Sequence, residues 1–283
     1  MTRTPVDHTS SLPPRAELEA FRNTVWDHYA EHCREMPWRG VDDPYAVLVS
    51  EVMLQQTQVA RVEPLYRAWM DAFPTVDALA AAPLALVLER WQGLGYNRRA
   101  VALKRAAEQV VQEYGGRIPC DVAALRRLPG IGPTTAAAIV NYAFRTPAPF
   151  IETNVRAAVL HHFFADADDV HDRDLMPVIE ETWDREDPRG WGYALMDYGT
   201  HLKRTMPNPS RRSRHHSRQS RFEGSRRQKR ALLLRAVLAD PGRPADVYAD
   251  GTGIPVGVTL DVLEELQREG FVRAADDVWG VPG

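Results

Sequence analysis

Residues 128–140 read LPGIGPTTAAAIV, a leucine and two glycines, Gly130 and Gly132, that lead into a run of helix-forming residues. Glycine permits the positive φ of a tight turn, and proline suits the first position of a helix. A glycine-rich turn at a helix start presents backbone N–H groups to an anion such as a phosphate. Many proteins use such a turn only to join two helices. The stretch predicts a helical hairpin and leaves its ligand open.

Helix-length segments separated by Pro and Gly continue on both sides of this hairpin, and none of them alternates with period two. They span residues 16–34, 44–59, 62–72, 75–80, 83–91, 97–113, 121–127, 133–144, 154–164, 174–183 and 189–203. We therefore expect an all-α domain over residues 16–203.

The remainder of the chain changes character. Residues 204–225 are rich in Ser, Arg, His and Pro, and we expect a basic linker or a surface-hugging loop there. Helical patterns at 226–239 and 257–270 precede two short strands in 271–281. Residues 226–283 thus resemble a small winged-helix module, a fold that binds DNA in some proteins and only other proteins elsewhere.

Charge is distributed unevenly along these 283 residues. The net charge is −3, but residues 201–230 hold eleven Lys and Arg and one acid, a balance of +10, which leaves −13 for the remainder. A positive stripe on an acidic body favours a polyanionic partner. A solvated, disordered linker is the alternative.

The sequence contains little that indicates a metal site, a disulfide bond or a membrane-spanning segment. Cys33 and Cys120 form no CxxC pair, and adjacent His residues at 161–162 and 215–216 do not share a helix face. Residues 1–15 have no apolar signal core, and no stretch is long and apolar enough to span a membrane. We expect a cytoplasmic protein without a metal site.

Two glutamates are candidate reactive groups. Glu51 shares an apolar helix face with Val47 and Leu48, where desolvation raises a carboxyl pKa toward the range of a general acid. The alternative is a core glutamate neutralised by Arg39. Glu152 precedes Thr153 and Asn154 at a helix start, where the helix dipole predicts a low pKa. The alternative for Glu152 is an ordinary helix-start acid, with Thr153 or Asn154 as the cap.

Seven motifs occur in the order found in the MutY-type adenine DNA glycosylases of the helix-hairpin-helix superfamily, which the chain resembles over about residues 20–203. They are PWR (37–39), DPYAVLVSEVMLQQTQV (43–59), FPTVDALA (73–80), WQGLGYNRRA (91–100), LPGIGPTTAAAIVNYAF (128–144), ETNV (152–155) and MDYG (196–199). The resemblance implies two helical subdomains with the active site between them. It also implies a monomer that flips adenine out of double-stranded DNA opposite 8-oxoguanine and hydrolyses its glycosidic bond.

The resemblance assigns roles to individual residues. Glu51 matches the general acid, Asn154 an active-site amide, and Arg39 a residue lining the adenine pocket. Gln56 matches the residue wedged into the DNA stack, and Leu94 and Tyr96 match contacts to the oxidised guanine. Further DNA contacts are expected from Gln55, Thr57, Gly130, Gly132 and Thr134, and from Arg211 and Arg212 in the basic segment.

The chain departs from the family pattern at the catalytic carboxylate, where the family has aspartate and this chain has Glu152. A second departure is that Lys203, Ser210, Ser213 and Gln219 stand where the family has four iron–sulfur cysteines. No cluster is therefore expected, although a monovalent cation at the hairpin 128–132 remains an option. The tail also lacks the pattern of the large oxidised-guanine-recognition domain of many members.

The expected reaction is base removal without strand cleavage, because Thr134 stands where the related endonuclease III has its lysine nucleophile. A nucleoid-associated adenine glycosylase is the first hypothesis. A glycosylase for uracil, thymine or hypoxanthine, and a catalytically weakened lesion-binding protein, are the alternatives.

Overall fold

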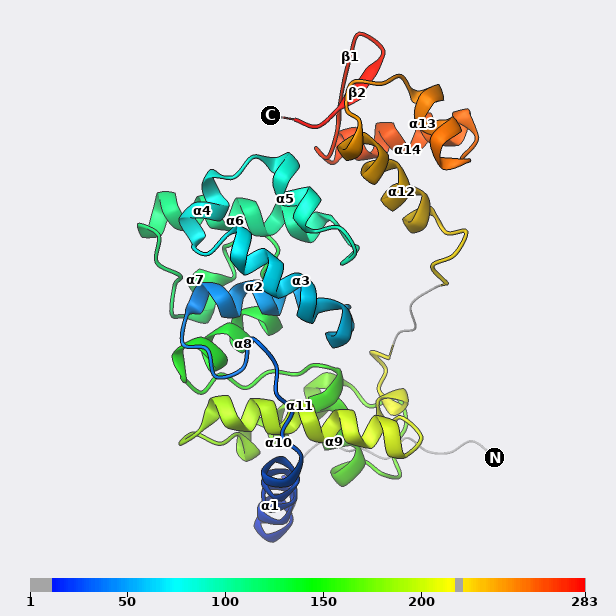
Figure 1. Ribbon diagram of the computed structural model, residues 1–283. Coiled ribbons are helices and arrows are strands. Elements are labelled where there is room, and N and C mark those ends of the chain that lie inside the picture. The colour runs from blue at the N-terminus through cyan, green and yellow to red at the C-terminus, as the bar shows by residue number, and fades with distance from the viewer. Residues whose placement is uncertain (1–11, 217–220, 283) are drawn as a thin grey trace, which may run out of the picture. The chain divides into compact units, whose positions relative to one another are not determined.

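A computed structural model describes residues 12–216 and 221–282, and within them the protein is mostly helical (Figure 1). The chain forms two compact units, each built from separate stretches of sequence. The first comprises Met1–Val47, Cys120–Arg126 and Gly132–Arg218, and the second comprises Leu48–Pro119, Arg127–Ile131 and Gln219–Gly283. The expected all-α fold with two helical parts is confirmed.

The first unit is helical throughout its described residues. Its elements are α1 (Arg15–His32), the start of α2 (Pro44–Leu54), α7 (Val122–Leu125), α8 (Pro133–Phe144), α9 (Thr153–Phe163), α10 (Asp172–Thr182), α11 (Pro188–Thr205) and the short 3-10 helix η1 (Pro209–Arg212). Helix α11 packs against α1, α8 and α9.

The second unit adds a small antiparallel hairpin to its helices. Its elements are the rest of α2, α3 (Val59–Ala72), α4 (Val76–Ala81), α5 (Leu84–Arg90), α6 (Arg98–Tyr114), α12 (Arg226–Ala239), α13 (Ala245–Thr252), α14 (Val256–Arg268), β1 (Arg273–Ala275) and β2 (Val278–Gly280). The expected helices and hairpin of the C-terminal module are present, and α13 is an addition that the sequence pattern did not indicate.

One expected helix, residues 44–59, is wrong as a single element. Helix α2 ends at Leu54, and α3 begins at Val59. Gln56 between them has a φ of 53°, a left-handed conformation that interrupts a helix. The apolar periodicity continues across this break, so the pattern alone could not locate it.

Close approach between α9 and α11 depends on Gly199. A Cβ atom at this position would lie 2.2 Å from the carbonyl oxygen of Asn154. No side chain fits at that distance, so glycine is what lets α11 lie directly on the first turn of α9.

The second unit has an aromatic core. Trp69 and Trp91 are fully buried and meet edge to face with ring centroids 5.3 Å apart, and Phe73 packs on Trp69. Trp183 is buried in the first unit. These tryptophans are therefore core residues.

The predicted hairpin is present between α7 and α8. Gly130 has a φ of 78°, and a Cβ there would lie 2.8 Å from the Ala102 Cβ, so both conformation and space require glycine. Gly132 is the N-cap of α8, and Pro133 is its first residue. The first-turn N–H groups of α8 have no partner within the helix and face outward from its start.

Residues 204–216 of the basic segment belong to the first unit and pack within it. The 3-10 helix η1 packs against α9, and Ser210 is buried. Ser213 forms an isolated bridge with Val170. Residues 217–220 lie outside the described residues, as does the N-terminal stretch before residue 12.

Candidate active site

Glu152 is the N-cap of α9. Its Oε1 accepts hydrogen bonds from the backbone N–H groups of Asn154, at 2.5 Å, and Val155, at 2.8 Å. The cap is therefore Glu152 itself, not Thr153 or Asn154. A carboxylate at this point satisfies two helix N–H groups that otherwise lack partners.

The pKa of Glu152 is raised, because burial of the carboxylate outweighs the groups that favour its anion. Those groups are the two backbone N–H donors and the positive charges of Lys203 and Arg156. The low pKa expected from the helix dipole is therefore wrong. The residue as a whole keeps some exposed surface, but its carboxylate is enclosed at the helix start, and this enclosure disfavours the anion. A buried anion with a raised pKa is a base of useful strength.

Asn154 is held from two sides. Its Nδ2 donates to Glu152 Oε2 at 3.1 Å, and its Oδ1 accepts from Thr200 Oγ1 at 3.1 Å. Thr200 lies on α11, one residue after the close contact at Gly199. The structure thus places the two candidate residues of the ETNV motif side by side, with the MDYG helix fixing their geometry.

Lys203 is a neighbour of Glu152 that the sequence did not assign to the site. The charge of Glu152 raises the pKa of Lys203, but burial lowers it more. Ser210 adds a second link, since its Oγ donates to the Thr153 carbonyl at 3.0 Å. Both residues stand where the family has cluster cysteines, and here they contact the helix that carries Glu152.

Arg39 forms a bidentate pair with buried Asp197, with N···O distances of 2.7 and 2.8 Å. Burial opposes ionisation of Asp197, but the hydrogen bonds and charges of Arg39 and Arg34 lower its pKa overall. The Arg39 guanidinium also lies 4.6 Å from the Tyr193 ring centroid. The carboxylate partner of Arg39 that the structure shows is thus Asp197 of the MDYG motif. The suggestion that Arg39 neutralises Glu51 stays a prediction.

Glu51 lies on α2, half-buried, on the face that the sequence predicts to be apolar. Its helical neighbours Val47 and Leu48 are buried. Its assignment as the general acid stays a prediction.

Arg99 organises two motifs of the second unit, and the sequence did not single it out. Its guanidinium donates to three carbonyls at the end of α2, those of Val52, Met53 and Gln55, at 2.7–2.9 Å. It also donates to the Leu94 and Gly95 carbonyls at 3.2 and 3.0 Å and to Thr57 Oγ1 at 3.0 Å. Burial lowers the pKa of Arg99 to about 10, so it stays charged at neutral pH. One cation thus joins the QQT turn to the GLGY loop.

The residues that this arginine positions differ in exposure. Tyr96 is 39% exposed with a φ of 48°, and Gln56 is exposed at the break after α2. Gln55 Nε2 reaches the Gly130 carbonyl at 3.5 Å. Leu94 is only 2% exposed, so the predicted contact of its side chain with guanine is not available in this structure. An apolar residue in a tight loop packs inward unless a ligand replaces that packing.

At the hairpin, Thr134 is exposed on the first turn of α8, and its Oγ1 reaches the Ile151 carbonyl at 3.5 Å. The exposed Gly132 and Thr134 suit a phosphate at the helix start. That role stays a prediction.

The two arginines of the basic segment that the sequence selects, Arg211 and Arg212, behave differently. Arg211 is exposed. Arg212 donates to the Leu160 carbonyl at 3.1 Å and to the Ala165 carbonyl, at the end of α9. Part of its guanidinium is thus engaged within the protein, and the phosphate-binding role of Arg212 stays a prediction. Sequence could not show this, since it depends on how η1 folds back.

Cys33 and Cys120 are both exposed and free. Among residues 12–216 and 221–282, no three His, Cys, Asp or Glu side chains converge as metal ligands. No helix in the same ranges is long and apolar enough to cross a membrane.

Comparison with known proteins gives a family match over residues 49–184, to the HhH-GPD superfamily base excision DNA repair proteins. The chain is 47% identical over 138 residues to an adenine DNA glycosylase of Mycolicibacterium smegmatis, covering 47% of each chain. It is 35% identical over 149 residues to a thymine/uracil-DNA glycosylase of Pyrobaculum aerophilum, covering 52% of this chain and 65% of that one. The match to the first of these relatives thus spans about half its length.

Solved structures show the same fold. A thermostable thymine-DNA glycosylase superposes with a TM-score of 0.62 at 24% identity, covering 69% of this chain and 91% of that one. A non-covalent endonuclease III–DNA complex superposes with a TM-score of 0.59 at 19% identity, covering 69% and 91%.

Proposed function

We propose that the chain, whose residues 49–184 match the HhH-GPD superfamily of base excision DNA repair proteins, is a monofunctional DNA glycosylase that removes adenine mispaired with 8-oxoguanine. It would act as a monomer on double-stranded DNA. The observation that carries the proposal is the enclosed Glu152 carboxylate, which Asn154 and the first turn of α9 fix in position. The 47% identity to a relative named adenine DNA glycosylase supports adenine as the base.

The chemistry uses two carboxyl groups in different states. Protonated Glu51 gives its proton to the adenine ring, and the electron pair of the bond between sugar C1′ and the base leaves with adenine. The sugar becomes an oxocarbenium ion, which the Glu152 carboxylate stabilises. Water then adds to C1′, and its proton passes to Glu152, whose raised pKa suits it to accept it. The products are free adenine and an abasic site.

Strand cleavage is not expected. Cleavage by a bifunctional glycosylase needs an amine nucleophile to form a Schiff base with the sugar. The exposed residue at the corresponding position of α8 is Thr134, which has no amine.

The test is a panel of labelled duplexes that each carry one mispair, incubated with excess protein and analysed with and without alkali. Adenine release opposite 8-oxoguanine, with strand breaks only after alkali, is the expected result. Breaks without alkali would contradict the monofunctional assignment. Tight binding to the adenine mispair without release of any base would favour the lesion-binding alternative.

A second candidate is removal of thymine or uracil from mispairs. It is favoured by the 35% identity to a relative named thymine/uracil-DNA glycosylase and by Glu152, which differs from the aspartate of the adenine-specific pattern. The same panel decides, because a thymine or uracil glycosylase leaves the adenine duplexes intact.

A further inference from the structure

The second unit contains a groove of about 1190 Å³ that the proposed catalytic groups do not use. One wall is formed by Gln55–Gln58, Arg61 and the loop from Gln92 to Arg99, and the other by α12, α14 and Phe222. The first wall holds the residues that the sequence motifs relate to DNA contacts. The second wall belongs to the C-terminal module, to which the motifs assign no role.

One ion pair joins the module to the first wall, and others hold α12 and α14 together within the module. Glu269 of α14 pairs with Arg98 at 2.7 Å and with Arg230 of α12 at 2.6 Å. Glu265 pairs with Arg226 and Arg230. The pKa values of both glutamates are lowered by these arginines, so the two acids of the groove are ionised and neutralised.

The groove keeps a positive excess. Its lining holds six arginines and two glutamates, a formal balance of +4. Arg61 and Arg235 are exposed and make no ion pair with any residue that the structure describes. An excess of arginine in a hollow attracts a polyanion.

Aromatic rings accompany the charge. Tyr96 is 39% exposed and Phe222 is 52% exposed. Arg227 of α12 donates to Tyr96 Oη at 2.6 Å, and its guanidinium lies 5.6 Å from the ring centroid. Exposed aromatic rings among arginines are the combination that holds a nucleic acid strand, because bases stack on the rings while phosphates pair with the cations.

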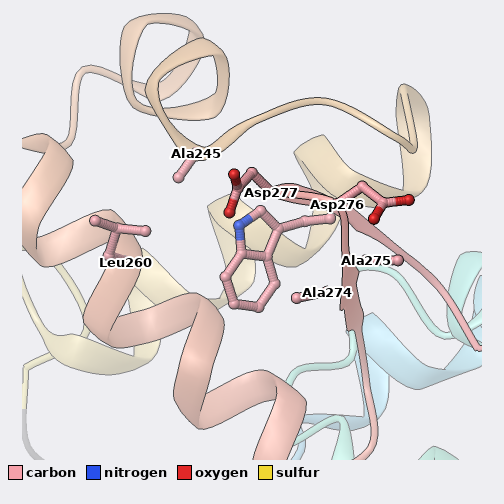
Figure 2. Close-up of a pocket in the computed structure, with 7 residues that line it drawn as sticks. Ala245, Leu260, Ala274, Ala275, Asp276 and Asp277 are labelled. Carbon is pink, nitrogen blue, oxygen red and sulfur yellow. The ribbon is translucent and has the colours of Figure 1, made fainter.

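The other face of the module has the opposite charge. Its hairpin tip carries Asp276 and Asp277, beside a separate pocket of about 470 Å³ that also includes Ala245 and Leu260 (Figure 2). Asp261 and Glu264 are exposed on α14. These acids repel phosphates, so the hairpin tip and the side of α14 that carries Asp261 and Glu264 are poor DNA-binding surfaces.

We propose that the groove between the 92–99 loop and α12 binds one strand of the DNA substrate. In this arrangement Arg61 and Arg235 pair with phosphates and a base stacks on Tyr96. Arg227 is a positioning residue that fixes the Tyr96 ring. The C-terminal module therefore acts as a DNA-binding element through its groove wall, chiefly α12, while its hairpin tip and the side of α14 that carries Asp261 and Glu264 stay away from the DNA. This inference rests on the proposed function, whose substrate is DNA.

The test measures binding of the full-length protein to a fluorescein-labelled duplex with one adenine–8-oxoguanine mispair, by anisotropy at several salt concentrations. Each phosphate contact contributes a slope of about 0.9 in log Kd against log salt. The double variant Arg61→Ala/Arg235→Ala should therefore flatten the slope by about 2. The matched control Arg268→Ala/Arg273→Ala removes two exposed arginines of the same module outside the groove and should leave the slope unchanged.

Two further variants test the stacking. Tyr96→Ala should weaken binding about tenfold or more. Arg227→Met, which keeps an unbranched apolar stem but loses the hydrogen bond and the cation, should weaken it by a smaller factor. An unchanged slope in the Arg61/Arg235 variant, or an equal change in the control, overturns the proposal. The assay measures DNA binding and does not depend on base release. A protein that excises no base can therefore still support the proposed DNA-binding role of the groove, and an active enzyme can still contradict it.

Discussion

Glu152 combines two roles that one substitution can separate. Glu152→Gln keeps an oxygen that accepts from the Asn154 and Val155 N–H groups, so the helix cap should survive. A neutral amide cannot stabilise an oxocarbenium ion, so single-turnover base release should fall by about 10² or more. Full activity in Glu152→Gln would show that the carboxylate is only a cap.

The same variant has a defined effect on stability. Because the pKa of Glu152 is raised in the folded protein, ionisation costs folding free energy at pH values above that pKa. Glu152→Gln removes this cost, so its Tm should equal or exceed that of the wild type at neutral pH. The difference should shrink as pH falls and Glu152 becomes protonated. Melting curves from pH 7 to acid pH check the sign, and a variant that is less stable at pH 7 contradicts it.

Glu152→Asp supplies the side chain of the family pattern. It keeps the charge and shortens the arm by one methylene, so measurable excision should remain while Glu152→Gln loses most of it. In the wild type, activity should fall as pH falls through the raised pKa, at a higher pH than for an unperturbed glutamate. A rate profile that stays flat into the acid range would exclude Glu152 as the working anion.

Sequence motifs identified most residues of the candidate site but not their partners. ETNV marked Glu152 and Asn154, yet the raised pKa depends on enclosure by neighbouring elements, which no local pattern shows. The pairing of Arg39 with Asp197 joins residues 158 positions apart in the sequence. Helix-dipole reasoning considers only the helix itself and therefore gave the wrong direction for the pKa of Glu152.

At the scale of elements, Arg99 holds the end of α2 and the 94–95 loop together. Arg99→Lys keeps a charge but cannot reach six acceptors, so several buried carbonyls lose their donors at about 1–3 kcal/mol each. We expect a loss of about 3 kcal/mol or more in unfolding free energy, measured by urea denaturation. The control Arg90→Lys changes an exposed arginine on α5 and should be neutral. Equal stability of the two variants would remove Arg99 from this role.

Helix α9 should make the first unit sensitive to acid. His162 Nε2 forms a hydrogen bond with Tyr198 Oη at 2.8 Å. Burial, together with the charge of His161, lowers the pKa of His162 to about 4. An unfolded histidine titrates near about 6.5, so between these values the unfolded state binds more protons. Stability should therefore fall as pH decreases from about 6.5 toward about 4. His162→Phe should flatten this dependence, whereas His215→Phe on an exposed loop should not.

The sequence pattern predicted the positions of the helices well. It predicted less well where each helix ends and how the helices pack together. The continuous apolar face of 44–59 concealed a break that Gln56 makes with a left-handed backbone. Likewise, the basic segment gave no sign that Arg212 folds back onto α9, because charge alone does not distinguish a solvent-facing arginine from one that caps a helix.

For the whole molecule, contacts between segments that are far apart in the sequence decide which residues belong to each unit. The C-terminal residues 219–283 cluster with Leu48–Pro119, so a groove forms between segments that a linear division of the chain keeps apart. The resemblance covers only about residues 20–203 and could not indicate what α12 contacts. The sequence therefore could not assign a role in the groove to Arg227, Arg230 and Glu269. That role depends on the packing of the module against the 92–99 loop.

The last prediction concerns the metal content of the whole protein. The family's cluster positions carry Lys203, Ser210 and Ser213 here, and the fourth, Gln219, lies outside the described residues. Ser210 and Ser213 are buried. Ser210 Oγ donates to the Thr153 carbonyl, and the backbone on either side of Ser213 pairs with Val170, since Val170 N–H donates to the Arg212 carbonyl and Arg214 N–H donates to the Val170 carbonyl. An iron–sulfur cluster needs cysteine thiolates, and the chain has only Cys33 and Cys120, far apart in sequence. The purified protein should therefore be colourless, contain no stoichiometric iron and excise bases equally well after treatment with a chelator. Stoichiometric iron with an absorption band at about 400 nm would contradict this prediction and require ligands other than the aligned positions.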